Sequence, residues 1–357
     1  MNEPSWEPVP YTLDLADGIL ALHRRAWGEL EITRAEYHRW QYQENPAGPA
    51  LSTVARERNT GELIGQFGAI PLRASINGEP QIAALALNVV TDPAYRRQGV
   101  FARLGHAANG QMAKAGIAFA FALPNENSFP GFVRHLGYHH VGDVPLLVRP
   151  VNVRRLVARR LPLPGLGALA AALSRPFAPP LPGSAPPVDD VTVVPVERFD
   201  SAFDVFWQRI CRRQRVMVVR DAAYLEWRFR QIPLRRYFPF QAVVADDLAG
   251  YIVLRRAEIL GMRAGLVVDF VVDPASGERV GVALLAQAAA HFASENVDLL
   301  ASLMLPHVPE YGLLRRTHFW PVPRPLLPQR FRLVARGGPV VRKLEHWFLT
   351  MGDYDLA

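Results

Sequence analysis

The first half of the chain shifts repeatedly between two spacings of hydrophobic residues. Residues 11–27 and 99–116 carry apolar positions every three or four residues, which predicts two amphipathic helices. Residues 51–92, between them, alternate apolar and polar positions and read as strands joined by Gly-containing turns. Residues 117–150 then predict a short buried strand, a short helix and a further strand. This order predicts an α+β fold.

The second half of the sequence echoes the first at nearly constant spacing. The segment "AEYHRWQYQENP" (35–46) matches "AAYLEWRFRQIP" (222–233), so that Trp40 corresponds to Trp227 with an offset of 187. Two later pairs have an offset of 181: "VVTDPA" with "FVVDPA", and "GFVRHLGY" with "GLLRRTHF". Three matches in the same order predict two lobes of one fold. Two unrelated domains with similar patterning are the alternative.

A stretch of different composition separates the two halves. Residues 151–190 begin with paired arginines, continue rich in Ala and Leu, and end rich in proline. Proline fixes φ and removes a backbone donor, so the end of this stretch reads as a linker. We expect a lobe at 1–150, an arm and linker at 151–190, and a second lobe with a C-terminal tail at 191–357.

Charge and cysteine content narrow the function only in part. The formal net charge of +7 comes from scattered arginines and favours anionic partners in general. We expect no nucleic-acid binding, because no basic stripe interleaved with aromatic residues appears outside the arm. The single cysteine, Cys211, lies beside apolar residues and is expected to be a buried structural thiol. The sequence shows neither a signal peptide nor an apolar run of about 18 residues, which favours a cytoplasmic location.

A basic stretch, "TDPAYRRQGVFARLG" (91–105), stands between an apolar strand and a helix. A helix begins with unpaired N–H groups and the positive end of its dipole, and together these bind phosphate. Gly99 permits a close backbone approach, and Arg96 and Arg97 add positive charge. The stretch therefore suits a pyrophosphate held by backbone amides. An ordinary strand–helix turn with a solvated basic loop is the alternative.

Part of this stretch, "YRRQGVFARL", resembles the acyl-CoA loop of the GNAT superfamily of N-acyltransferases, which reads Arg/Gln-x-x-Gly-x-Gly/Ala. Arg96, Gly99 and Phe101 occupy the three defined positions, with Phe101 in place of the usual small residue. A second match is "PNENSFPGFVRHLGY", where Asn127 and the pair Gly137-Tyr138 fit the family pattern. Together with the internal repeat, the resemblance implies two fused GNAT-like lobes, each a mixed, mostly antiparallel sheet flanked by helices.

The resemblance also implies a reaction, in which an acetyl or short acyl group passes from acyl-CoA to a primary amine of a small molecule, without a metal. A backbone N–H of the preceding strand would polarise the thioester carbonyl. The strand end and the loop would bind acetyl-CoA or another acyl-CoA, through Val89, Val90, Thr91, Arg96, Arg97, Gln98, Gly99, Val100, Phe101 and Asn127.

The catalytic acid and base have only candidate positions. Many family members carry a tyrosine several residues before the Gly-aromatic pair, where this chain has Val133. Tyr138 and Tyr95 are the alternative acids and Glu126 is the candidate base, and a purely structural role is the alternative for each of them. His135, His139 and His140 lack the spacing of a metal site.

The second lobe keeps the strand–turn–helix pattern but changes the loop. Glu278 would repel phosphate, and the place of Gly99 falls on Val280, unless a shift of one residue brings in Gly281. We expect this lobe to bind no cofactor and to shape the substrate site. In the tail "EHWFLTMGDYDLA" (345–357), Asp353 is a third catalytic candidate, expected to alternate along a strand with Asp355.

Three further expectations concern partners. The signatures "W-x-Y-x-x-N-P" and "P-N-E-N-S" resemble bacterial members associated with surface-polysaccharide assembly, which makes an amino sugar a candidate acceptor. Residues 152–175 could form a basic-then-apolar helix that contacts the inner membrane face peripherally, or could pack between the lobes. A catalytically degenerate binding or scaffold protein is the alternative to an enzyme, and the oligomeric state is left open.

Overall fold

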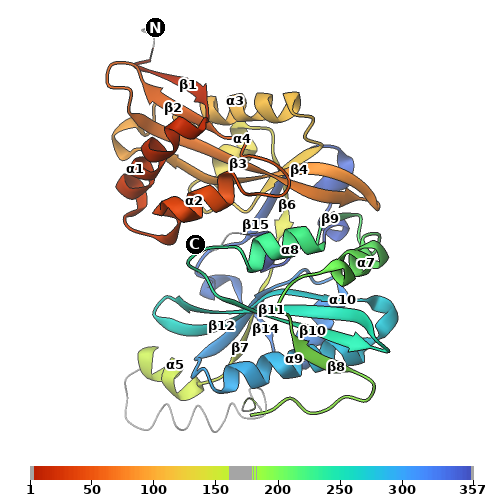
Figure 1. Cartoon of the computed structure of the whole chain (residues 1–357). Helices are drawn as coiled ribbons and strands as arrows, with labels where there is room; N and C mark the ends of the chain where they lie inside the picture. Colours follow the sequence, from red (N-terminus) through yellow and green to blue (C-terminus); the bar gives the residue numbers. More distant parts are fainter. Residues whose placement is uncertain (1–3, 161–178, 180, 182, 355–357) are drawn as a thin grey trace.

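The computed structural model describes residues 4–160, 179, 181 and 183–354. These residues form two sheets that lie one above the other, with helix α8 (Ala222–Phe229) between them (Figure 1). The C-terminal segment also lies between the two lobes (Figure 1). Within these ranges, no helix has the length and apolar character needed to cross a membrane.

The first sheet is antiparallel except for one central pair, β4 with β5. A short strand, β9 (Val216–Val218), pairs with the end of β3. The other strands of the first sheet are, in spatial order, β1 (Trp6–Pro10), β2 (Thr53–Glu57), β3 (Leu63–Ile76), β4 (Glu79–Thr91), β5 (Phe119–Ala122), β15 (Arg332–Arg336) and β6 (His139–Asp143).

Alternation along these strands divides their side chains between two faces. Along β3, Phe67 and Ala69 pack with Val100 and Leu104 of helix α3, whereas Ile70 belongs to the core between the lobes. This period of two is what a strand buried on both faces requires. The helices of this lobe are α1 (Ala16–Trp27), α2 (Ala35–Tyr42), α3 (Val100–Lys114) and α4 (Phe129–His135).

The second sheet repeats the strand order of the first. It too contains one parallel pair at its centre, β12 with β13. Its strands in spatial order are β8 (Thr192–Pro195), β10 (Tyr237–Val244), β11 (Asp247–Ile259), β12 (Met262–Val272), β13 (Leu299–Leu303), β7 (Leu146–Pro150) and β14 (Trp320–Pro321). Its helices are α5 (Val153–Arg160), α7 (Ser201–Ile210), α8, α9 (Glu278–Ala293) and α10 (Pro309–Arg316).

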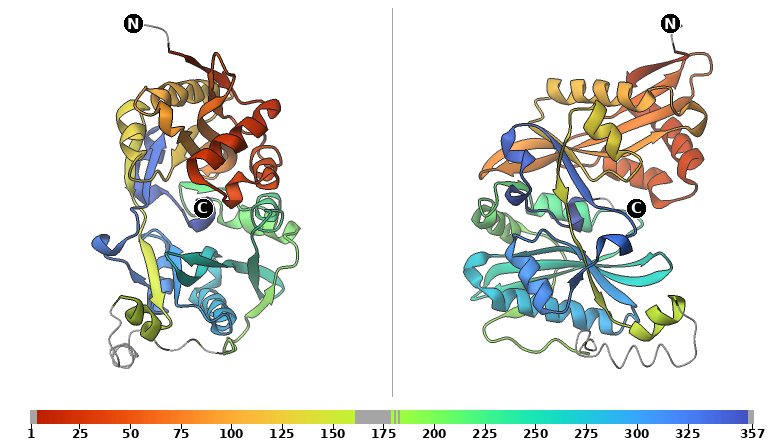
Figure 2. Two further views of the ribbon diagram at one scale, coloured as in Figure 1. Left: turned by 90° about the vertical axis from the view of Figure 1, so that its left-hand side faces the viewer. Right: turned by 180° about the vertical axis from the view of Figure 1, so that it is seen from behind.

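Each sheet contains strands from the other half of the chain: β7 in the second sheet, and β15 with the short strand β9 in the first. β7, from the first half, lies between β13 and β14 of the second sheet. β15, from the second half, lies between β5 and β6 of the first sheet. Figure 2 shows the yellow strand β7 in the lower lobe and the blue strand β15 in the upper lobe. The division into residues 1–150 and 191–357 stays a prediction about domains, because the sheets themselves exchange strands across it.

The two echoed segments become helices α2 and α8, which meet between the lobes. The rings of Trp40 and Trp227 stack with centroids 4.7 Å apart and planes at 17°. Each indole N–H donates to the backbone carbonyl of the other tryptophan, Trp40 Nε1 to Trp227 O at 2.9 Å and Trp227 Nε1 to Trp40 O at 3.1 Å. This reciprocity is the contact expected across a local two-fold axis. A continuous hydrophobic core then spans both lobes.

Three sequence-based expectations need correction or restriction. The tail forms no strand at Asp353; Met351–Asp353 is a 3₁₀ turn, closed by the side chain of Thr350. In the second lobe the glycine before the helix is Gly277, not Gly281, which lies inside α9 against Leu313. Within the arm and linker, residues 161–178, 180 and 182 lie outside the described residues.

Candidate active site

The two central strands of the first sheet separate and leave a cleft between them. β4 and β5 pair only from Ala83 with Phe119 to Leu85 with Phe121. Beyond Leu85, no strand among the described residues pairs with the edge of β4 that faced β5. A cavity of about 360 Å³ opens at this point, and its wall includes Leu87, Asn88 and Val89 of β4. Backbone N–H groups on an open strand edge can hold a chain of amides or polarise a carbonyl.

Apolar side chains from several elements line most of this cleft. Trp27 ends helix α1, and Leu30 and Ile32 follow it, while Phe132 comes from α4. Asn125 and Ser128 bring polar atoms from the loop after β5, and Tyr354 does so from the C-terminal segment. An apolar wall with a few converging polar groups is the usual construction of a small-molecule site.

The loop before α3 has the backbone geometry of an anion site. Gly99 lies in the left-handed region, at φ 76° and ψ 8°, and Arg97 has φ 62°. The first backbone bond of the helix runs from Arg103 N–H to Gly99 O at 3.1 Å. The N–H groups of Val100, Phe101 and Ala102 therefore have no acceptor within the helix. The loop from Arg96 to Gly99 is exposed, so the start of the helix lies at the surface of the protein.

Phe101 turns away from this loop. Its ring meets Phe67 and Phe132 edge to face, with centroids 6.1 and 5.6 Å apart. It also lies over Gly131 of α4, where an added Cβ would fall 2.4 Å from the ring. The large side chain thus packs into the core beneath α4, and the departure from the family pattern leaves the backbone amides clear.

The predicted cofactor residues of β4 do not all face one way. Val89 lines the cleft, whereas Val90 is buried opposite Gln66 on the neighbouring strand. Asn127 is exposed in the loop after β5. Its neighbour Asn125, which the sequence analysis missed, organises that loop: Oδ1 of Asn125 accepts from the N–H groups of Asn127 and Ser128 at 3.1 and 3.0 Å.

The three catalytic candidates lie in different places. Glu126 pairs with Arg332 of β15 at 2.7 Å and is half exposed. Tyr138 is buried beneath α4 with its ring 5.0 Å from Phe132, and its hydroxyl has no hydrogen-bond partner. Burial raises the pKa of Tyr138 well above the ordinary phenol value, so it holds its proton. None of the three belongs to the cleft wall described above.

Asp353 belongs to a buried ionic cluster of the second lobe. One carboxylate oxygen, Oδ2, accepts from Arg220 Nη2 at 2.6 Å. Arg220 also contacts Asp269 at 3.2 Å, and Thr350 Oγ1 donates to Asp269 at 2.9 Å. Burial raises the pKa of Asp353, an effect that the charge of Arg220 opposes. This cluster anchors the C-terminal segment, whose next residue, Tyr354, reaches the cleft.

A hydrogen-bonded chain of buried polar groups lies behind the cleft wall and was not foreseen from the sequence. His23 Nε2 is 2.6 Å from Gln66 Oε1, and Gln66 Nε2 donates to Tyr42 Oη at 2.6 Å. Asn88 Nδ2 donates to the same hydroxyl at 3.1 Å and to Gln41 Oε1 at 2.7 Å. Burial lowers the pKa of His23 to about 4, so this imidazole is neutral at pH 7. Buried polar residues spread over α1, α2 and β3 give no local sequence signal.

The second lobe has no equivalent cleft among the described residues, because the C-terminal segment fills that place. Thr350 forms a bridge to Met304, just past the end of β13, and bonds to Asp269 of β12. Phe348 and Leu349 are buried beside it. The loop before α9 is also three residues shorter, since four positions separate Asp273 from Gly277 but seven separate Asp92 from Gly99. Glu278 stands at the first position of that helix and pairs with Arg316.

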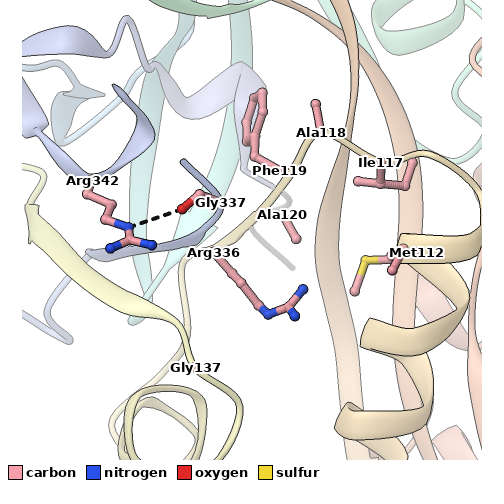
Figure 3. A pocket seen from close by; sticks show the side chains of 10 residues that line it. Met112, Ile117, Ala118, Phe119, Ala120, Gly137, Arg336, Gly337 and Arg342 are labelled. Atoms are coloured by element: carbon pink, nitrogen blue, oxygen red, sulfur yellow. Dashed lines mark hydrogen bonds between the residues drawn. The ribbon is translucent and has the colours of Figure 1, made fainter. Parts of the chain in front are cut away.

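A second hollow, of about 310 Å³, lies at the other end of β5 (Figure 3). Its floor is apolar, and Arg336 extends toward it from the end of β15. Arg342 stands on the opposite side and donates through Nε to Gly337 O at 3.1 Å. Phe119, at the start of β5, lines this hollow, whereas Ala122, at the end of that strand, lines the cleft. No cluster of three or more metal-ligating side chains occurs in the described ranges.

Comparison with known proteins gives a family for the first lobe and similar folds for the whole chain. Residues 8–141 match the family model of an acetyltransferase (GNAT) domain. No curated protein matches the sequence. Among solved structures, a GCN5-related N-acetyltransferase from Anabaena variabilis has a TM-score of 0.65 at 13% identity, over 96% of this chain and 75% of that one.

Two further structures share the whole two-lobe arrangement. N-myristoyltransferase from Saccharomyces cerevisiae, solved with myristoyl-CoA, has a TM-score of 0.63 at 14% identity, over 95% of this chain and 85% of that one. A GCN5-related N-acetyltransferase from Kribbella flavida has a TM-score of 0.58 at 16% identity, over 93% and 70%. These likenesses concern the fold, whereas the family match falls on the lobe with the cleft and the α3 loop. The family model thus assigns residues 8–141 to a GNAT acetyltransferase domain, the family that the sequence motifs resemble.

Proposed function

We propose that the chain transfers an acetyl or short acyl group from acyl-CoA to a primary amine of a small molecule. The observation that carries the proposal is the cleft between the separated ends of β4 and β5, together with the open amides at the start of α3. The pyrophosphate would bind the amides that follow Gly99, and the pantetheine arm would pair with the open edge of β4 near Val89. Arg96 and Arg97 would add positive charge at the mouth of the loop.

In the reaction the amine nitrogen attacks the thioester carbonyl carbon, an amide forms and the C–S bond breaks. One proton leaves the amine, and the CoA thiolate takes up one proton to become the thiol. A backbone N–H on the open edge of β4 would stabilise the developing oxyanion, and positioning of the two substrates would supply much of the rate. Tyr138 is buried with no partner, so Tyr354 at the cleft wall is the better placed phenol for the leaving thiolate.

The length of the acyl chain that the cleft accepts is a separate question from the identity of the amine. The wall of the cleft is largely apolar, and the yeast structure of similar fold contains myristoyl-CoA. A cavity of about 360 Å³ equals the liquid volume of about a dozen water molecules. This space accepts more than an acetyl group, so a series of acyl donors is needed to define the preference.

The decisive experiment combines binding and turnover. Calorimetry with acetyl-, butanoyl- and octanoyl-CoA measures donor affinity, and thiol release with a panel of amines, including amino sugars, measures transfer. Donor binding with amine-dependent thiol release supports the proposal. Donor binding without release for every amine would favour a binding or scaffold role, and absence of donor binding would refute the enzyme assignment.

The proposed membrane contact of residues 152–175 keeps only part of its basis. In α5, Arg155 pairs with Asp298 at 2.5 Å and donates to Asn296. This arginine therefore binds the second lobe and does not point to a lipid surface. Sedimentation with anionic vesicles, at low and high salt, tests whether the rest of the arm contacts a membrane.

A further inference from the structure

Asn88 holds an unusual position in β4, at the point where the strand borders the cleft. The register of β3 and β4 shifts between Gln66 and Gly68, so Asn88 and Val89 form an irregularity in the ladder. Asn88 has φ 49°, a left-handed value that asparagine tolerates better than most residues. Non-glycine residues held in this region of φ often mark functional positions.

The carboxamide of Asn88 has a fixed orientation. Its Nδ2 donates to two oxygen atoms behind the cleft, Gln41 Oε1 at 2.7 Å and Tyr42 Oη at 3.1 Å. The Tyr42 hydroxyl is held in turn by Gln66, and Gln66 by His23. A reversed amide would place an oxygen opposite Gln41 Oε1, so the network selects one orientation.

The fixed orientation leaves Oδ1 of Asn88 for the cleft. Asn88 is part of the cleft wall, and Tyr42, one of the two groups that hold its nitrogen, is fully buried behind that wall. A carbonyl oxygen at this place accepts a hydrogen bond from an N–H donor. It carries no net charge, so it does not trap the donor as an ammonium ion, and an amine must be neutral to attack.

Resting on the proposed function, we propose that Asn88 binds the acceptor amine and orients its lone pair toward the thioester. Tyr42, Gln66 and His23 are positioning residues that act through the carboxamide of Asn88. The chemical class selected is a primary amine, since an alcohol of the same shape offers one hydrogen where a primary amine offers two. The equivalent position of the second lobe, at the offset of 181, is Asp269, which is bound to Arg220.

The test compares two variants of Asn88 with a matched control. Asn88→Gly keeps the left-handed backbone but removes the carbonyl, and Asn88→Asp puts a charged acceptor in its place. Asn77→Ala is the control, because Asn77 also has a positive φ, 55°, but lies in the β3–β4 turn away from the cleft. Each variant is assayed with acetyl-CoA and the best primary amine of the panel, for kcat and for both KM values.

The expected result is a change in the amine parameters alone. Asn88→Gly should raise the KM for the amine at least about tenfold, the effect of one lost hydrogen bond of about 1.4 kcal/mol, with the KM for acetyl-CoA within about twofold. Asn88→Asp should stabilise the ammonium form and move the pH–rate profile to higher pH. Tyr42→Phe, which removes a positioning hydroxyl, should raise the amine KM less than Asn88→Gly.

Three outcomes would overturn the inference, and they are distinguishable. If the wild-type protein binds acetyl-CoA but acylates no amine, the proposed function fails and the inference fails with it. If amines are acylated and both Asn88 variants keep the wild-type amine KM and pH profile, only the role of Asn88 is refuted. An equal loss of activity in Asn77→Ala would assign the effect to folding, and would also count against the role.

Discussion

Replacement of Gly99 separates the charge of the proposed phosphate site from its backbone shape. At φ 76° and ψ 8°, an alanine would pay about 1–2 kcal/mol for the left-handed conformation. Asparagine and aspartate tolerate this region and are equally good residues at a helix N-cap. An added Cβ meets no atom within 4 Å, so neither side chain clashes with the protein. Gly99→Asn and Gly99→Asp therefore differ chiefly in one negative charge.

That charge would face the cofactor pyrophosphate. Two unit charges at about 4 Å interact by about 1 kcal/mol in bulk water and by about 4 kcal/mol at a partly screened surface. The loop is exposed, so we expect an intermediate penalty of about 2 kcal/mol, or about thirtyfold in Kd. The same carboxylate stabilises the start of α3 through the helix dipole. Gly99→Asp should therefore bind acetyl-CoA more weakly than Gly99→Asn while unfolding at the same or a higher temperature.

Calorimetry with acetyl-CoA and thermal unfolding together measure the two effects. Gly277→Asp is a control for a charge placed before a helix, because Gly277 precedes α9, at φ 77° and ψ 173°, in the lobe without the longer loop. We expect that variant to keep the wild-type affinity. Equal affinity of Gly99→Asp and Gly99→Asn, with both proteins folded, would place the phosphates elsewhere and refute the reasoning.

Three other expected outcomes test the remaining assignments. Tyr138→Phe removes a buried hydroxyl without a partner, so unfolding free energy should stay equal or rise by about 1 kcal/mol, and a large drop in kcat would restore Tyr138 as a catalytic residue. Trp40→Phe and Trp227→Phe should each cost about 1 kcal/mol of stability, and a double-mutant cycle with coupling below about 0.5 kcal/mol would deny that the two reciprocal bonds act as a unit. Burial lowers the pKa of both His23 and His38 to about 4, from an ordinary 6.5. Between these two pH values the unfolded chain binds protons that the folded chain does not bind. The free energy of unfolding therefore falls as the pH drops below about 6.5, by up to about 1.4 kcal/mol per pH unit for each histidine. His38→Phe should lessen this slope in urea unfolding measured from pH 7 to pH 4, and an unchanged slope would contradict the assignment.

Much of the scaffold follows from local sequence signals. Alternating and helical spacings marked the strands and helices of the first lobe, and Cys211 is buried as expected. The strand–turn–helix at residues 91–105 gave the loop before α3 because glycine, arginines and helix start are adjacent in sequence. The sequence match between Trp40 and Trp227 predicted that helices α2 and α8 occupy equivalent positions in the two lobes. It did not predict that the two helices contact each other.

The features that were missed depend on long-range pairing. Alternation of apolar and polar residues predicts that β7 and β15 are strands, but it does not predict which sheet each strand joins. The tail looked like a strand because Trp347, Phe348 and Leu349 are apolar, yet these residues fill the second lobe as an irregular segment. Asn88 was overlooked because its significance comes from a ladder irregularity and from partners on α2, neither of which a linear pattern reveals.

The exchanged strands β7 and β15 make the two lobes interdependent during synthesis and during motion. The acyl-CoA lobe lacks its sixth strand in spatial order until residue 336 has left the ribosome, so its cleft is completed late. Until then β5 and β6 expose unpaired edges, which are prone to aggregate and to attract chaperones. In the finished protein each exchanged strand is bonded on both sides. The lobes therefore cannot swing apart about one linker, because two strands would first have to leave the sheets in which they are paired.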